Sequence, residues 1–180
     1  KLLKAGSDCS NGLPTPRVDM SLSWVVGNVS NPEEPWRHHR FLSHSNLPGE
    51  WATNPESIWG TWDPSHVVLD DGRVFVSTCH GNVTRGTFLF RANRWDGNYQ
   101  PVGTGPILVN PADGTPIRTC DTFMWHSPKR NSMHMITFNC GGTNRILHAV
   151  APGPQFDTWE LTEGSRECLV NASSPLCEAA

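Results

Sequence analysis

The chain has 180 residues, a length that suits one domain with a substantial core. Its 14 Lys and Arg against 17 Asp and Glu give a net charge of −3, and no basic block occurs, so a nucleic-acid partner is not expected. No apolar run approaches the roughly 20 residues that a membrane-spanning helix needs, so no membrane span is expected.

The first segment, residues 1–17, is polar and contains Gly and Pro, so we expect it to form an entry loop. After this loop the chain repeats one pattern three times, starting at Asp19, Asp63 and Asp121. Each copy has an Asp, an apolar strand, a second strand that ends in a small polar cluster, and a Trp or Tyr. A period of roughly 40–60 residues that holds several short strands is typical of a β-propeller blade.

The strands expected in each copy are short β-branched or aromatic stretches bounded by turn residues. In chain order they lie at 24–26 and 40–45, at 74–76 and 87–92, and at 135–138 and 145–150. Asp70-Asp71-Gly72 predicts a hairpin turn, because Gly accepts the positive φ that such turns require. Residues 127–131 are expected to form the matching turn of the third copy. No segment combines helical periodicity with caps, so no helix is expected.

These elements predict an all-β fold of about three propeller-like blades over residues 18–168, followed by a C-terminal tail at 169–180. Closed propellers typically have four to eight blades. Three copies therefore leave three alternatives: a missing segment completes the ring, a second polypeptide completes it, or the strands form fewer and larger sheets. The less patterned stretch from Thr162 onward could begin a further blade.

Six cysteines accompany three glycosylation sequons, which begin at Asn28, Asn82 and Asn171. An even cysteine count together with sequons is typical of the secretory route, so we expect a secreted, extracellular glycoprotein with disulfide bonds. Six cysteines allow 15 pairings, and the sequence does not choose among them. Cys79 and Cys140 each follow the first strong strand of their copy, so a disulfide between them is one candidate.

The segment Trp62-Asp63-Pro64-Ser65, followed by an apolar strand and a Gly turn, resembles part of a known family. So does the run from Leu42 to Trp51, of which the stretch from His148 to Trp159 is a looser copy. The resemblance is to the five-bladed β-propeller glycosidases of glycoside hydrolase families 43 and 32, and it covers about residues 18–168. It implies a protein that hydrolyses glycosidic bonds.

The same resemblance implies three catalytic carboxyl groups, in the order base or nucleophile, orienting residue and acid. The matching positions are Asp19, Asp121 and Glu167, and Glu167-Cys168 is similar to the Glu-Cys pair that carries the acid in the invertase group. Glycoside hydrolysis needs two carboxyl groups across one sugar, one to protonate the leaving oxygen and one to attack or to activate water. The alternative for each acid is a capping or turn residue that recurs because the blade recurs.

Aromatic and imidazole side chains form a second candidate set. Indole faces stack on sugar rings, while Asp and His bind hydroxyl groups. The residues expected to bind substrate are Trp62, Asp63, His80, Trp125 and His126. The alternative for the Trp residues is packing between blades, which we expect of Trp24, Trp51, Trp95 and Trp159.

Metal chemistry is not indicated by the histidines and cysteines. No pair has the tight spacing of a zinc site, and adjacent residues such as His38 and His39 face opposite ways on a strand. We therefore expect no cofactor, and only a structural calcium ion in a propeller axis is left open.

The function favoured by these residues is that of a secreted carbohydrate-active protein that cleaves glycosidic bonds with paired carboxylates. A non-catalytic sugar-binding lectin or cell-surface recognition module is the alternative from a different class. A processed subunit of a larger propeller is the third.

Overall fold

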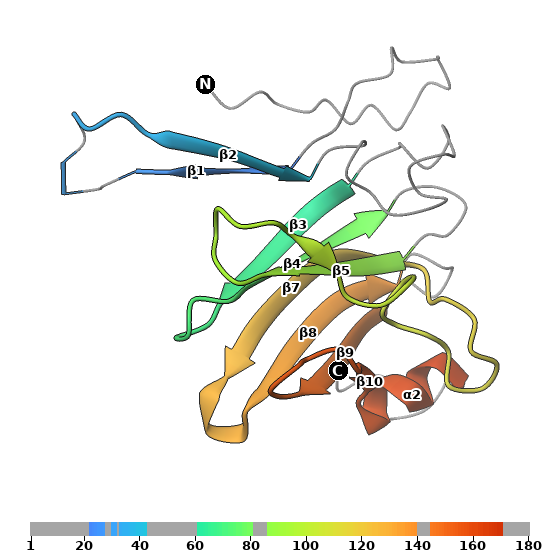
Figure 1. Ribbon diagram of the computed structural model, residues 1–180. Helices are drawn as coiled ribbons and strands as arrows, with labels where there is room; N and C mark the ends of the chain where they lie inside the picture. The colour runs from blue at the N-terminus through green and yellow to red at the C-terminus, as the bar shows by residue number, and fades with distance from the viewer. Residues whose placement is uncertain are drawn as a thin grey trace, which may run out of the picture.

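The computed structural model describes residues 22–27, 30, 31, 33–42, 61–80, 86–139 and 145–170. Three antiparallel sheets make up most of this part of the chain (Figure 1). A two-stranded ribbon contains β1 (Leu22–Val26) and β2 (Arg37–Leu42). The first four-stranded sheet contains β3 (Thr61–Val68), β4 (Val74–His80), β5 (Gly86–Ala92) and β6 (Gln100–Pro101). The second contains β7 (Thr119–Ser127), β8 (Ser132–Asn139), β9 (Arg145–Pro152) and β10 (Glu160–Leu161).

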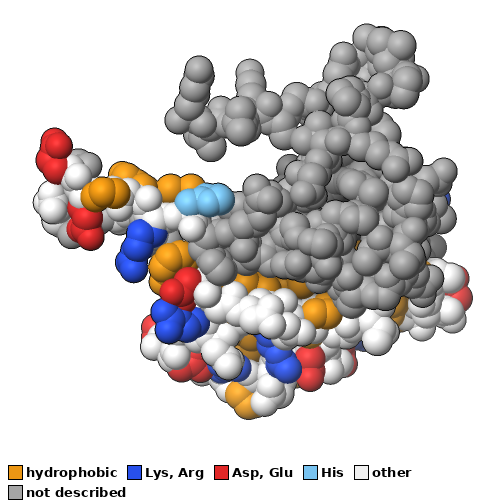
Figure 2. Space-filling model, turned by 45° about the horizontal axis from the view of Figure 1, so that its top comes forward, with side chains coloured by type: hydrophobic (Ala, Val, Ile, Leu, Met, Phe, Trp, Pro, Cys, Tyr) orange, Lys and Arg blue, Asp and Glu red, His pale blue; other side chains and the backbone are white. Residues whose placement is uncertain are grey.

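Both four-stranded sheets are meanders in which strands that are consecutive in the sequence are neighbours in space. This is the organisation of a propeller blade, so the predicted all-β class is confirmed and the second and third copies of the repeat each form a blade-like sheet. Of the first copy, the described residues form only the β1–β2 ribbon, which projects to one side (Figures 1 and 2). The ribbon exposes Val25 and Trp36, and Arg37 lies over the ring of Trp95.

The two predicted hairpin turns are confirmed. In the first, the N–H of Gly72 donates to the carbonyl of Leu69 at 2.9 Å, and Gly72 has a φ of 88°. In the second, a 3₁₀ turn at Pro128–Arg130 ends at Asn131, which has a φ of 45° and donates to the carbonyl of Pro128 at 3.1 Å. Gly and Asn are the residues that adopt this left-handed conformation most readily, so local sequence sets both turns.

The expectation that no segment is helical is wrong for α2 (Glu163–Val170), which occupies part of the stretch that could have begun a further blade. The Thr162 hydroxyl donates to Ser165 Oγ at 3.2 Å, and the N–H of Arg166 donates to the Thr162 carbonyl at 2.9 Å. Glu163 lies in the first turn, where the helix dipole favours an acid. Because this segment lacks the two-residue apolar alternation of a strand, its polar N-terminal residues start a helix instead.

The main hydrophobic core lies between the two four-stranded sheets. On one side it contains residues of β3, β4 and β5, namely Val67, Phe75 and Leu89. On the other side it contains residues of β7, β8 and β9, namely Met124, Met133, Met135, Leu147, Ala149 and Ala151. Trp159 is buried in the same core, as expected of a Trp that packs between blades.

A second core cluster covers the opposite face of β4 and β5 and includes Phe88 and Phe90. Trp95 packs against it, as predicted, whereas the structure describes no side chain for Trp24 and nothing of Trp51.

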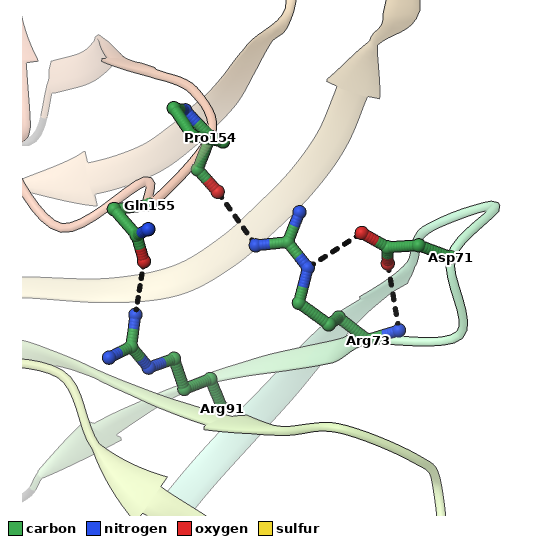
Figure 3. Close-up of polar contacts among 5 residues, drawn as sticks. All are labelled: Asp71, Arg73, Arg91, Pro154 and Gln155. Atoms are coloured by element: carbon green, nitrogen blue, oxygen red, sulfur yellow. Dashed lines mark hydrogen bonds and ion pairs between the residues drawn. The ribbon is translucent and has the colours of Figure 1, made fainter.

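Polar contacts also join the two sheets at the end where the hairpin turn of β3 and β4 lies (Figure 3). Arg73 donates to the carbonyl of Pro154 at 2.7 Å and forms an ion pair with Asp71 at 2.8 Å. Arg91 donates to Gln155 Oε1 at 3.2 Å. The guanidinium of Arg73 also lies 5.8 Å from the ring centre of Phe156. This end of the interface is therefore held by two arginines on the first sheet and one loop on the second.

The cysteines give only a partial test of the predicted disulfides. Cys79 is buried in β4 and forms no disulfide, so the Cys79–Cys140 bond is not present in this structure. Its side chain packs in the interior as a small apolar residue. Cys140 lies outside the described residues, and the other disulfides stay a prediction.

Candidate functional site

Strands β3 and β7 each contain a β-bulge at the same point of their sheet. In β3, Trp62 pairs with Cys79 and Ser65 pairs with Ser77, so one extra residue lies in between. In β7, Cys120 pairs with Phe138 and Phe123 pairs with Ile136, so one extra residue lies between these pairs as well. The residue after the first pair is Asp63 in β3 and Asp121 in β7. The two aspartates that open the second and third copies of the repeat therefore occupy equivalent bulged positions.

Asp121 has an uncommon backbone conformation. Its φ is 51°, in the left-handed region, and its side chain is exposed. Asp tolerates this region better than most residues, but the conformation is still unfavourable compared with an extended one. Bulges are over-represented beside active sites because they redirect a side chain, and unfavourable backbone conformations collect at functional sites. Asp121 is therefore the strongest single candidate among the described side chains.

Four buried hydroxyl groups hold the bulge of β7 against the first sheet. Thr87 and Thr119 share a hydrogen bond of 2.7 Å, and Ser77 donates to Thr122 at 3.2 Å. Asp121 lies between the two anchored residues of β7. We call these four residues the hydroxyl clamp. Because the clamp fixes the chain on both sides of Asp121, the bulge has little freedom to relax.

The two bulges lie at the same end of neighbouring strands. The N–H of Met124 on β7 donates to Ser65 Oγ on β3 at 2.9 Å, and β3 and β7 run in the same direction (Figure 1). Asp63 is two residues before Ser65 and Asp121 is three before Met124, which corresponds to about 7–10 Å of strand. Both aspartates therefore lie on the same side of this contact, at one end of the strands of the two sheets, and we call this end the bulge edge.

Two further predicted residues belong to the bulge edge by their backbone positions. Trp62 precedes Asp63 in β3, and His80, the last residue of β4, pairs with Thr61. Sheet pairing thus brings Trp62, Asp63 and His80 to the end of the sheets that also contains Asp121. The structure describes their backbone, and their side-chain roles stay predictions.

Trp125 and His126 lie farther along β7 and face opposite sides of the sheet. The indole of Trp125 stacks on His134 and His148, with ring centres 5.0 and 5.7 Å apart. His126 instead packs edge-on against Phe156 at 5.6 Å, and its Nε2 is buried without a hydrogen-bond partner among the described residues. Consecutive strand residues point to opposite faces, so the structure does not bring these two side chains together.

The structure does not test the other two predicted catalytic residues. Asp19 lies outside the described residues. Glu167 belongs to α2, which follows β10 at the edge of the second sheet opposite β7. The first turn of α2 is held on β9, because the N–H of His148 donates to Ser165 Oγ at 2.8 Å. The side chain of Glu167 is not described, and its role as an acid stays a prediction.

Sequence reasoning missed the hydroxyl clamp and the two histidines under Trp125. The Nδ1 of His134 and the Nε2 of His148 are 3.1 Å apart, and Ser132 Oγ is 3.0 Å from His134 Nε2. Burial lowers the pKa of both imidazoles, and for His134 the nearby His148 and Arg130 lower the pKa further. The signal available in the sequence was their strand alternation, which places both rings on the face of Trp125.

Within the described ranges, no group of three or more His, Cys, Asp and Glu side chains is arranged to hold a metal ion. In the same part of the chain, no helix combines the length and apolarity that crossing a bilayer requires.

Comparison with known proteins gives partial structural matches only. No family model and no curated protein matches the sequence. An exo-β-1,3-galactanase from Clostridium thermocellum aligns with a TM-score of 0.45 and 11% identity over 57% of this chain and 23% of its own. The GH43_1 enzyme from Xanthomonas citri, solved with xylose, aligns with a TM-score of 0.40 and 14% identity over 56% of this chain and 31% of its own.

A GH43 β-xylosidase/α-arabinofuranosidase from a compost metagenome aligns with a TM-score of 0.38 and 14% identity, over 57% of this chain and 36% of its own. The family-43 glycosidases that the sequence resembles are thus among the structural neighbours, as a partial match at low identity. The chain spans less than two fifths of the length of these proteins.

Proposed function

We propose that the protein is a secreted carbohydrate-active protein that hydrolyses a glycosidic bond at the bulge edge. The observation that carries this proposal is the exposed Asp121, whose φ of 51° is held between two buried hydroxyl pairs. The repetition of the same bulge at Asp63 supports it, because two carboxylates on neighbouring strands are a starting arrangement for glycoside hydrolysis.

In this proposal Asp121 orients the reacting groups, and its exposed side chain lies at the bulge edge. Asp19 is proposed as base or nucleophile and Glu167 as acid, and both of these roles rest on the family resemblance. The separation of the two reacting carboxyl groups would decide the stereochemistry, since about 5–5.5 Å favours retention and about 6.5–9.5 Å favours inversion. An acid that works near neutral pH needs a raised pKa, which burial or a neighbouring carboxylate can provide.

Sugar recognition in this proposal comes from Trp62, Asp63 and His80. Their backbone positions place all three at the bulge edge. An indole face can cover the apolar side of a sugar ring, while a carboxylate and an imidazole bind its hydroxyl groups.

The experiment is a hydrolysis assay on a panel of chromogenic pentosides and hexosides with the wild type and with Asp121→Asn. Asn keeps the shape of Asp and accepts the left-handed conformation, so the fold is preserved while the carboxylate is lost. We expect a loss of at least about 100-fold in kcat/KM, because a small misplacement of the reacting groups can cost about that much. Asp157→Asn, another exposed aspartate, is the matched control and should keep full activity. Equal activity of wild type and Asp121→Asn would contradict the proposal.

A non-catalytic sugar-binding module is the second candidate. It needs the aromatic and polar residues of the bulge edge but no pair of carboxyl groups, and Asp121 is the one predicted acid whose side chain lies within the described residues. A glycan array combined with the hydrolysis panel separates the two candidates: binding without turnover supports the module, and turnover supports the enzyme. The mass of the secreted protein before and after glycosidase treatment and reduction would test glycosylation and an attached second polypeptide.

A further inference from the structure

Strands β7, β8 and β9 expose an apolar and aromatic face on the side turned away from the first sheet. Burial alternates along β8 and β9, so the residues between the core positions point to this side. We call it the outer face, and it contains Phe123, Trp125, His134, Ile136, Ile146, His148 and Val150. Phe123 is 63% exposed, Ile146 51% and Ile136 39%. Exposed patches of this kind mark interaction surfaces.

Strand register shows that the outer face is equivalent to a face that is covered in the first sheet. Val67 pairs with Phe75 in the first sheet as Trp125 pairs with His134 in the second. Leu89 pairs with Ser77 as His148 pairs with Ile136. The bulges confirm this alignment, because the bulge of β3 lies as many residues before Val67 as the bulge of β7 lies before Trp125.

In the first sheet the equivalent residues form part of the main core. Val67 is 8% exposed, Phe75 0% and Leu89 1%, and the second sheet is what covers them. The covering side chains are unbranched or small: Met133, Met135, Leu147, Ala149 and Ala151. The outer face of the second sheet has no such cover within the described part of the chain.

We propose that the outer face is a docking surface for a further antiparallel β-sheet that presents unbranched and small apolar side chains, as β8 and β9 do to the first sheet. The occupant is inferred from the interface that already exists in this molecule. The proposal is independent of the proposed hydrolase activity.

The polar groups of the outer face are suited to burial by such a sheet. The two imidazoles lie within 18° of a common plane and are joined by their hydrogen bond, so they form an edge-to-edge pair. The indole of Trp125 lies over this pair, within 14° of parallel. Ser132 contacts the remaining nitrogen of His134. Because most of the ring nitrogens already have partners, covering the pair leaves few polar atoms to desolvate.

One ring nitrogen, the Nδ1 of His148, has no hydrogen bond among the described residues. The existing interface combines its apolar core with hydroxyl pairs such as Thr87 and Thr119. A docked sheet with one Ser or Thr at the corresponding place would therefore satisfy His148. None of the seven outer-face residues is Asp, Glu, Lys or Arg, and Arg130, whose charge acts on His134, is exposed in the turn before β8 and can stay in water.

Carbethoxylation by diethyl pyrocarbonate, followed by peptide mass mapping, tests whether the face is covered. The protein as isolated from its producing cells is compared with the 180-residue chain expressed alone. We expect His134 and His148 to react at least about tenfold more slowly in the isolated protein, because a covered ring reacts only when the interface opens. His38, which is exposed on β2, is the internal control and should react alike in both. Equal reactivity of the two histidines in both samples would overturn the proposal.

Photo-cross-linking identifies the occupant. The photoreactive residue p-benzoylphenylalanine is placed at position 136 in the producing cells, and in a control at Val68, which is 59% exposed on β3. Adducts from position 136 to a peptide with alternating apolar residues, outside the sequence described here, support the proposal. Adducts to the outer face of a second copy, or protection of the histidines that depends on added saccharide, would overturn it. Identical adducts from positions 136 and 68 would also overturn the proposal.

Discussion

The hydroxyl pair of Thr87 and Thr119 offers a direct test of how the two sheets are held together. Thr87 is 0% exposed and Thr119 3%, and their oxygens are 2.7 Å apart. Replacing either Thr by Val keeps the shape of the side chain and removes one hydroxyl. The hydroxyl that remains is then buried without its partner, which costs about 1–3 kcal/mol.

The double variant should behave differently from the sum of the single ones. With both hydroxyls removed no polar group is left unsatisfied, although the site must widen because two methyl carbons need about 3.5–4.0 Å where the oxygens are 2.7 Å apart. Replacing both partners by apolar groups of the same shape is close to neutral. We therefore expect Thr87→Val and Thr119→Val to lower the free energy of unfolding by about 1–3 kcal/mol each, and the double variant to lower it by less than the sum of the two.

Urea unfolding followed by Trp fluorescence gives the three free-energy differences, provided that the slope with denaturant is unchanged. Additive losses in the double variant would refute the reasoning, because they would mean that the two hydroxyls do not depend on each other. Thr158→Val, at an exposed position outside the core, is the matched control and should change stability by less than about 0.5 kcal/mol.

Three further predictions concern the core, the contacts of Arg73 and the outer face. Phe156→Ala should lower the free energy of unfolding by about 3–5 kcal/mol in urea titration, since its ring is fully buried; a loss below about 1 kcal/mol would contradict this packing. Arg73→Met should lower the free energy of unfolding by about 1–2 kcal/mol, because the hydrogen bond to a backbone carbonyl and the ring contact are lost. Arg130→Met, at an exposed position, is the control for this variant. The lowered pKa of His134 and His148 means that the folded state binds fewer protons than the unfolded one. The contribution of this pair to stability should therefore be complete above about pH 6.5 and fall as the pH drops below it. Urea midpoints at pH 7.5 and 5.5 test this, and replacing both histidines by Asn should reduce the change in midpoint between the two pH values.

The sheets could be predicted from the sequence because their signals are local. Asp70-Asp71-Gly72 sets its turn by itself, and apolar runs such as Val74-Phe75-Val76 have few alternatives to a strand. Helix α2 was missed for the opposite reason. It has only two turns, and its start depends on Thr162 and Ser165, which contribute little to a periodicity count.

The candidate site could be predicted only in part. The repeat located Asp63 and Asp121, and their equivalence is confirmed by the paired bulges. The left-handed conformation of Asp121 depends on hydroxyl contacts between residues 32 and 45 positions apart, which no local pattern reveals. Trp125 and His126 were grouped because they are adjacent, although strand alternation separates them.

The meander order of each four-stranded sheet has a consequence for synthesis on the ribosome. Every strand pair in these sheets joins neighbours in the chain, so a sheet can form as soon as its own strands have emerged. The β3–β6 sheet is then complete while Phe75 and Leu89 still lack the Met and Ala side chains that will cover them. Until β7–β9 have been synthesised, this intermediate exposes apolar side chains and can aggregate with another nascent chain. A pause in the codons between β6 and β7 should therefore raise aggregation more than an equal pause after β10.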